Sequence, residues 1–125
     1  MNSGRKRKIL VADDEKCIRD TLCHALMLEG FIVESACDGK EALDKILEDK
    51  PDIIIMDGMM PQVDGIEACK RLRTKKETQD IPIILVSAQK DIVRNVQNLA
   101  GAPIKYIQKP CKLEYILASI NGILS

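Results

Sequence analysis

Three aspartates, a serine and a lysine each stand directly after a short apolar run. Asp13 and Asp14 follow the first such run, Asp57 the third, Ser87 the fourth and Lys109 the fifth. Crowded carboxylates repel one another, and a divalent cation with oxygen ligands is the natural way to neutralise them. A lysine and a hydroxyl beside such a cation suit a phosphoryl group, and one carboxylate can itself be the nucleophile. The pattern therefore suits phosphoryl chemistry in which an aspartate can be the nucleophile.

These side chains meet only if the apolar runs are parallel strands of one sheet. Continuous apolar runs bounded by turn residues are typical of strands buried on both faces. A stretch with helical apolar periodicity follows each run, so strands and helices alternate and the carboxyl ends of the strands share one edge. The chain is predicted to be an α/β protein, a three-layer, doubly wound (βα)5 sandwich. Its strands are expected at residues 8–12, 31–35, 53–57, 83–87 and 104–108.

Length and composition favour one cytoplasmic domain. We expect residues 1–7 to be a polar lead-in and residues 8–125 to be the folded domain. The zero net charge and scarce aromatic residues argue against direct DNA binding. No apolar run approaches the roughly 20 residues of a membrane span, and no signal-peptide pattern opens the chain, so no membrane partner is expected.

The scattered cysteines indicate neither a zinc site nor a disulfide framework, because no CxxC pair is present. We expect most of them to be small buried hydrophobic residues in a reducing cytosol. The single histidine, His24, is expected on the surface or core edge of the first helix rather than in a catalytic role.

Four motifs in order carry a resemblance to a known family. They are Asp13-Asp14-Glu15 with Arg19, Met56-Asp57-Gly58-Met59-Met60-Pro61 with Asp64-Gly65, Ser87-Ala88, and Tyr106-Ile107-Gln108-Lys109-Pro110. Together they resemble the receiver domain of two-component response regulators, of the single-domain chemotaxis or phosphorelay kind. The resemblance implies a flavodoxin-like fold with a five-stranded parallel sheet of order 2-1-3-4-5.

The resemblance also implies a phosphoacceptor and a metal site. Asp57 would accept a phosphoryl group from the phosphohistidine of a sensor histidine kinase or phosphotransfer protein. Asp14, Asp57 and the backbone carbonyl of Met59 would bind Mg²⁺, with Mn²⁺ as a substitute, and Asp13 would act through a metal-bound water. Lys109 would hold a phosphoryl oxygen and an Asp57 oxygen.

A switch is implied as well. Ser87 would bond a phosphoryl oxygen once it is attached, and Tyr106 would turn inward as Ser87 moves. Pro110 would follow a cis peptide bond that aims the lysine. The face formed by the fourth helix, fifth strand and fifth helix would then change for a downstream protein or a fused output domain. The chain would be a regulator rather than an enzyme, limited to self-phosphorylation from donors and slow autodephosphorylation.

Three departures from the family pattern are visible. The stretch from Gly101 to Tyr106 is one residue longer than usual, and Cys111 stands where a large apolar residue is commoner. Met59 and Gln89 occupy the two positions that flank the path of the hydrolytic water in this family. We expect an appreciable lifetime for the phosphorylated form.

Other functions fit the residues less well. A phosphatase with an aspartyl nucleophile needs a second acid two residues later, where this chain has Met59. In a flavin-binding electron carrier, Asp13-Asp14-Glu15 would repel the cofactor phosphate. A receiver-like module that is never phosphorylated would normally have lost part of its acid set. Taken singly, Asp13-Asp14 also fits a helix cap, Ser87 a small strand-end residue and Tyr106 simple packing.

Overall fold

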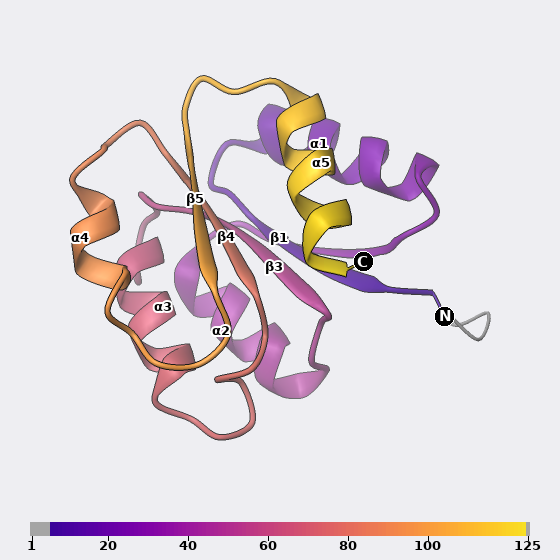
Figure 1. The fold of residues 1–125 in the computed structure, drawn as a ribbon. Helices are drawn as coiled ribbons and strands as arrows, with labels where there is room; N and C mark the ends of the chain where they lie inside the picture. Colours follow the sequence, from indigo (N-terminus) through magenta and orange to yellow (C-terminus); the bar gives the residue numbers. More distant parts are fainter. Residues whose placement is uncertain (1–5, 125) are drawn as a thin grey trace.

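Five strands alternate with five helices along the part of the chain that the structure describes, residues 6–124 without the side chains of residues 92 and 93 (Figure 1). The structure is a computed structural model. The strands are β1 (Lys8–Ala12), β2 (Ile32–Ala36), β3 (Ile53–Asp57), β4 (Ile83–Ser87) and β5 (Ile104–Gln108). The helices are α1 (Lys16–Leu28), α2 (Gly39–Glu48), α3 (Gly65–Arg73), α4 (Ile92–Val96) and α5 (Leu113–Leu124).

The strands form one parallel sheet in the order β2-β1-β3-β4-β5, which confirms the predicted topology. Ile9 of β1 lies in register with Val33 of β2 on one side and with Ile53 of β3 on the other. Because β1 and β3 are neighbours, their carboxyl ends open side by side. From β1 the chain adds β2 on one side of the sheet and then β3, β4 and β5 on the other, so the strand order reverses between β1 and β3. Ligands bind at such a point in open α/β folds.

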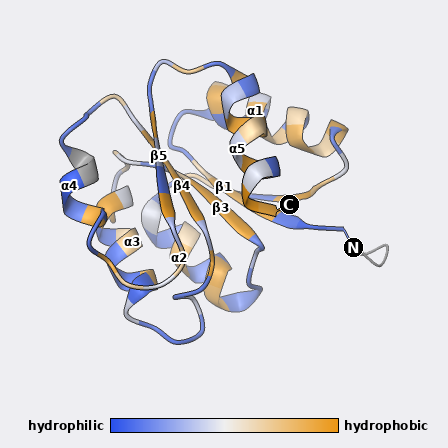
Figure 2. Ribbon diagram, viewed as in Figure 1, coloured by the Kyte–Doolittle hydropathy of each residue, from blue (hydrophilic) through white to orange (hydrophobic). Residues whose placement is uncertain are grey.

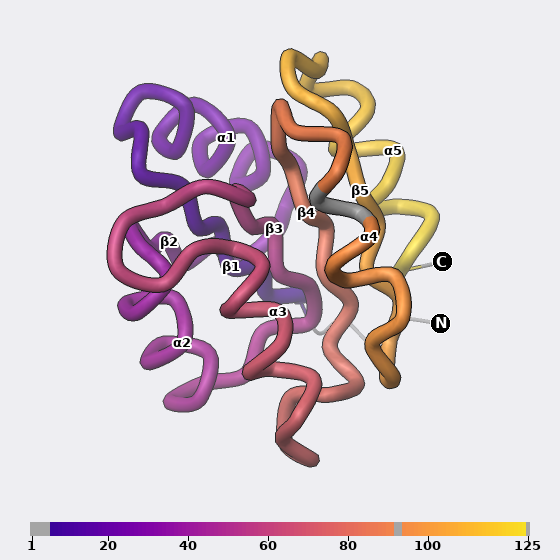
Figure 3. Tube along the Cα trace, turned by 90° about the vertical axis from the view of Figure 1, so that its left-hand side faces the viewer, coloured from indigo at the N-terminus to yellow at the C-terminus, as the bar shows by residue number. Residues whose placement is uncertain are grey.

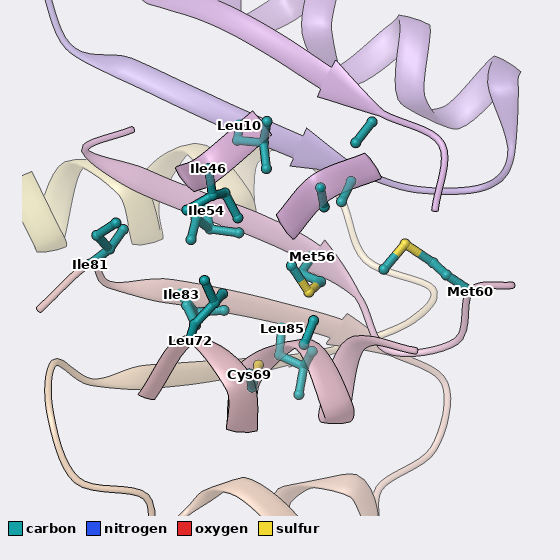
Figure 4. Close-up of a cluster of buried hydrophobic side chains, with 14 of the residues drawn as sticks. Leu10, Ile46, Ile54, Met56, Met60, Cys69, Leu72, Ile81, Ile83 and Leu85 are labelled. Atoms are coloured by element: carbon teal, nitrogen blue, oxygen red, sulfur yellow. The ribbon is translucent and has the colours of Figure 1, made fainter. Parts of the chain in front are cut away.

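The molecule has three layers, because helices cover both faces of the central sheet. α1 and α5 pack on one face, and α2, α3 and α4 pack on the other (Figures 1 and 3). Alternate residues of each strand serve the two cores, as the two-residue period of a strand requires. Ile54 and Met56 of β3 enter the core under α2 and α3 (Figure 4), whereas Ile53 and Ile55 enter the core under α1 and α5.

The position of each strand explains its composition. Every residue of the central strands β3 and β4 is buried, and these are the continuous apolar runs of the sequence. The edge strands β2 and β5 are partly exposed and carry polar residues, so the hydrophobic colour in Figure 2 is concentrated at the middle of the sheet. Full burial of one isoleucine is worth about 1.5–3 kcal/mol, so the central strands supply much of the stability.

Two local predictions were wrong. The apolar spacing predicted a fourth helix reaching Leu99, but α4 ends at Val96, and a tight turn follows in which the Leu99 amide donates to the Val96 carbonyl at 3.1 Å. Most cysteines were expected to be buried, but only Cys69 is; Cys17 and Cys37 are exposed, and the other two are partly exposed. Cysteine is small enough to occupy either environment, so residue type alone does not decide its burial.

Arg73, at the end of α3, ties three segments together. Its side chain is buried, and its guanidinium donates to the carbonyls of Thr78 at 3.2 Å, Ile81 at 2.7 Å and Ala102 at 3.0 Å. These carbonyls belong to the loops that precede β4 and β5. The residue therefore fixes how both strands enter the sheet.

Replacing Arg73 with methionine is expected to lower the free energy of unfolding by about 2–4 kcal/mol. Methionine fills a similar volume but leaves buried carbonyls without a donor, at about 1–3 kcal/mol for each unsatisfied group. Urea unfolding measures the change. Arg71→Met is the matched control, because Arg71 is exposed on the same helix and forms a surface ion pair with Glu67, so its loss should stay below about 1 kcal/mol. Equal losses in the two variants would contradict the proposed role of Arg73.

Candidate functional site

The carboxyl ends of β1 and β3 bring three carboxylates together. One oxygen each from Asp13, Asp14 and Asp57 lies within 4.8 Å of the others. Asp13 and Asp57 are only 6% and 7% exposed, whereas Asp14 is open to solvent. The structure thus places the three predicted acids in one cluster, with one member accessible from outside.

Lys109, just after β5, reaches across to this cluster. Its ammonium lies 3.3 Å from Oδ2 of Asp57 and 3.6 Å from Oδ2 of Asp13. Burial alone would lower the pKa of Lys109, but the negative charges of Asp57 and Asp13 raise it above its ordinary value. The lysine is therefore held in its charged form between two carboxylates. The peptide bond from Lys109 to Pro110 is cis, the isomer that the resemblance predicts.

Burial raises the pKa of Asp57 above its ordinary value. The Met59 amide, which donates to Oδ1 of Asp57 at 3.2 Å, and the Lys109 ammonium act in the opposite direction but are outweighed, and Asp13 adds repulsion. Together these groups disfavour the ionised form of the Asp57 carboxylate. A further positive charge near Asp57 would relieve the imbalance.

The loop after β3 holds Asp57 by its backbone. The Gly58 amide donates to the Val86 carbonyl at 2.9 Å, and the Gly65 amide donates to the Gly58 carbonyl at 3.1 Å. A Cβ on Gly65 would lie 2.3 Å from the carbonyl oxygen of Asp57, so only glycine permits this approach of α3 to the loop. The Met59 side chain projects from the same loop and is 56% exposed.

Ser87 and Tyr106 are joined at the end of β4. Ser87 is buried, and its hydroxyl accepts a hydrogen bond from the Gln89 amide at 3.1 Å. The Tyr106 hydroxyl donates to the Ser87 carbonyl at 2.9 Å, and its ring packs against the core cluster under α2, α3 and α4. The Lys109 amide also donates to the Ser87 carbonyl. Hydrogen bonds to the Ser87 carbonyl therefore connect both Tyr106 and Lys109 to the end of β4.

Arg19 belongs to the first sequence motif, but the sequence analysis predicted no role for it. Its guanidinium donates to the Asp13 carbonyl at 2.7 Å from the second turn of α1. Oδ1 of Asp13 accepts from the Glu15 amide, and Glu15, the N-cap residue of α1, makes no side-chain cap. Asp13 and Asp14 do not cap α1 in the usual way. The first motif includes this arginine, but its residue type and spacing do not reveal which group it bonds.

The donor set fits a hard divalent cation. It consists of carboxylate oxygens, and three negative charges face one ammonium group. Mg²⁺ prefers one or two carboxylates and keeps room for water and phosphate oxygens, which the exposed side of Asp14 permits.

The family model of the response regulator receiver domain matches residues 9–121 of the chain. The chain belongs to the response regulator receiver domain family. Receiver domains are signalling modules of two-component systems, and they generally bind Mg²⁺ at an acidic pocket.

Curated relatives of this receiver domain are larger proteins. The response regulator MprA of Mycolicibacterium vanbaalenii is 39% identical over 117 residues, which cover 94% of this chain and 50% of that protein. The MprA protein of Mycobacterium tuberculosis strain H37Rv gives the same identity and coverage. The receiver domain thus spans about half the length of the curated relatives it matches.

Solved receiver structures agree with the fold. The chemotaxis protein CheY4 of Vibrio cholerae has a TM-score of 0.85 at 28% identity, with coverage of 95% of this chain and 99% of that one. The signal receiver domain of a histidine kinase from Syntrophus aciditrophicus has a TM-score of 0.83 at 28% identity, covering 94% and 89%. Among the described residues, the helices of this receiver domain are too short or too polar to cross a membrane.

Proposed function

We propose that this receiver domain is a phosphorylation-controlled switch whose phosphoacceptor is Asp57. The observation that carries the proposal is the position of Asp57 at the end of β3, beside both the Lys109 ammonium and the carboxylates of Asp13 and Asp14. The donor is the phosphohistidine of a sensor histidine kinase or phosphotransfer protein. All five cysteines are free, in keeping with a reducing cytoplasm.

The transfer exchanges one bond to phosphorus for another. A carboxylate oxygen of Asp57 forms the new P–O bond while the P–N bond to the donor imidazole breaks, and the imidazole nitrogen keeps that electron pair. Lys109 stabilises negative charge on the phosphoryl oxygens, since positioning and charge neutralisation dominate this chemistry. Asp13, Asp14, Asp57 and the Met59 carbonyl would hold Mg²⁺, which when bound supplies further charge neutralisation.

The readout follows from the links at the end of β4. A phosphoryl group on Asp57 would draw the Ser87 hydroxyl toward it and away from the Gln89 amide. Tyr106 already lies inward here and is bonded to the Ser87 carbonyl. Phosphorylation would therefore favour this inward position over an outward one, and the surface of α4, β5 and α5 would shift for a downstream partner or fused output domain.

Incubation with acetyl phosphate tests the proposal, because this small donor needs no kinase. Intact-mass measurement should find one phosphoryl group per chain in the presence of Mg²⁺ or Mn²⁺ and almost none when EDTA removes the metal. The label should be lost in mild base, as expected for an acyl phosphate, and should be absent in Asp57→Asn. Label that persists in that variant would overturn the assignment.

The lifetime of the phosphorylated form gives a further prediction. Met59 is exposed and apolar beside the site, so replacing it with asparagine should help orient the hydrolytic water and speed dephosphorylation by about tenfold or more. Gln89→Ala should also change the rate. Decay of the phosphorylated mass after rapid removal of donor measures the rate. Met27→Asn, at a similarly exposed methionine on α1, is the control and should leave the rate unchanged. Wild-type decay rates in both the Met59 and the Gln89 variants would contradict a role of these residues in dephosphorylation.

A further inference from the structure

A cavity of about 600 Å³ lies between α1 and α5, beside the acidic cluster. Its walls are largely apolar and include Ile18 and Leu113, and one end reaches Asp13, Asp57 and Lys109. Its volume falls in the range of sites that bind small organic molecules, which are usually apolar with a few polar groups at one point. None of the roles proposed above for the phosphoacceptor uses its apolar part.

Two small side chains leave this space open. Cys17 stands in the first turn of α1, and Cys111 follows Pro110; both line the cavity. A large apolar residue is commoner at position 111 in the family pattern, and the smaller Cys111 side chain, which is partly exposed, occupies less of this space. Ile18 lines the same space and remains 42% exposed, so apolar surface is available for a ligand to cover.

The polar end of the cavity has an excess of negative charge. Three carboxylates, those of Asp13, Asp14 and Asp57, stand against two cations among the described residues: the Lys109 ammonium, which pairs with Asp13 and Asp57, and the Arg19 guanidinium, which donates to the Asp13 carbonyl. This end attracts a cation and repels an anion, while the rest of the cavity offers apolar contact. Only a molecule with both features matches the whole cavity.

We propose that the cavity binds a small organic ammonium ion. Its apolar body lies between α1 and α5, near Cys17 and Cys111, and its ammonium group lies at the carboxylates of Asp13 and Asp57. The ligand and a divalent cation need the same carboxylates, so binding of one excludes the other. The binding itself stands without the proposed function, but its consequence, ligand control of phosphorylation at Asp57, rests on that function.

Three ligands of nearly equal size distinguish the contribution of apolar contact from that of charge, because they share an apolar body and differ in the charge of the end group. They are phenylbutylamine, phenylbutanol and phenylbutyrate. Calorimetric titration of the metal-free wild-type protein should give at least about tenfold tighter binding for the amine than for the alcohol, because the ammonium gains a partly buried charge pair. The carboxylate should bind most weakly. Equal affinity of amine and alcohol would overturn the charge recognition, and no binding of the amine would overturn the site.

Variants that fill the cavity locate the ligand. Cys111→Phe and Cys17→Leu should each lower the affinity for phenylbutylamine by about tenfold or more, since the added side chain occupies the ligand's space. Cys37→Phe is the matched control, because Cys37 is exposed outside the cavity lining and should keep wild-type affinity. Thermal unfolding checks that each variant is folded. Wild-type affinity in both folded cavity variants would overturn the proposed location.

Competition with Mg²⁺ tests the orientation of the ligand. Increasing Mg²⁺ should weaken the apparent affinity for phenylbutylamine in proportion to Mg²⁺ occupancy, and the alcohol should be much less affected. Simultaneous binding of the amine and Mg²⁺ would overturn the placement of the ammonium at the carboxylates. A protein that binds the amine but shows no Mg²⁺ binding in a separate titration would count against the proposed function alone.

Discussion

Replacing Asp57 with asparagine is expected to raise the free energy of unfolding of the metal-free protein while abolishing phosphorylation. Burial raises the pKa of Asp57, and Lys109 compensates only in part, so the ionised carboxylate destabilises the folded state. Asparagine has nearly the same shape and no charge. The gain at neutral pH should be about 1–3 kcal/mol, the scale of an incompletely satisfied buried polar group.

The sign of the pH dependence follows from the direction of the shift. A carboxyl group with a raised pKa in the folded state costs no stability below its ordinary pKa, and the cost grows as pH rises toward the folded-state value. The advantage of Asp57→Asn should therefore be largest at neutral pH and disappear in acid. Mg²⁺ should shrink it, because the ion stabilises only a protein that binds it.

Urea unfolding at several pH values, with EDTA or Mg²⁺, measures these effects. Asp44→Asn is the control, because Asp44 pairs with Lys40 on the exposed face of α2 and its loss should change stability by less than about 1 kcal/mol at any pH. A metal-free Asp57→Asn protein that is less stable than wild type at neutral pH would show that Lys109 fully compensates the buried charge.

Replacing Gly39 with alanine is expected to cost about 3 kcal/mol or more. A Cβ at this position would lie 1.7 Å from the carbonyl oxygen of Val63, a backbone atom that cannot move aside as a side chain can. Either α2 or the loop between β3 and α3 must shift, with the loss of packing that overfilled cores show. Since that loop also carries Met59, the variant should bind Mg²⁺ more weakly than wild type.

The matched control for Gly39 is Gly122 in α5. Among the described residues, an added Cβ there would meet no atom within 4 Å outside the adjacent backbone of its own helix, so alanine should raise stability by up to about 1 kcal/mol through its better helix propensity. Thermal and urea unfolding of the two variants give the comparison. A Gly39→Ala protein within about 0.5 kcal/mol of wild type would mean that the close approach of α2 to Val63 does not hold in solution.

Much of the fold follows from strong local patterns. The fully buried runs of β3 and β4 and the polar residues after them predict a parallel sheet whose edge carries Asp57 and Ser87, and the structure has both. The adjacency of β1 and β3 is different. Local periodicity does not specify strand order, and this part of the prediction came from the ordered motifs and their family resemblance.

Other features depend on contacts between residues far apart in the chain, and the residue patterns of a single sequence do not predict such contacts. The bond from Arg19 to the Asp13 carbonyl and the approach of Gly39 to Val63 are of this kind. The exposure of Cys17 and the cavity beside it depend on how α1 lies against α5. Each needs the relative placement of two elements to within about an ångström, whereas residue patterns fix only the type of element.

Chemical mapping of the phosphorylated residue tests whether Asp57 is the phosphoacceptor. Borohydride reduces an aspartyl phosphate to homoserine, and peptide mass spectrometry then locates the converted residue after incubation with acetyl phosphate and Mg²⁺. Homoserine is expected at position 57 alone, with Asp13 and Asp14 unchanged. Conversion of Asp13 or Asp14, or phosphate on a residue that borohydride does not convert, would contradict Asp57 as the phosphoacceptor.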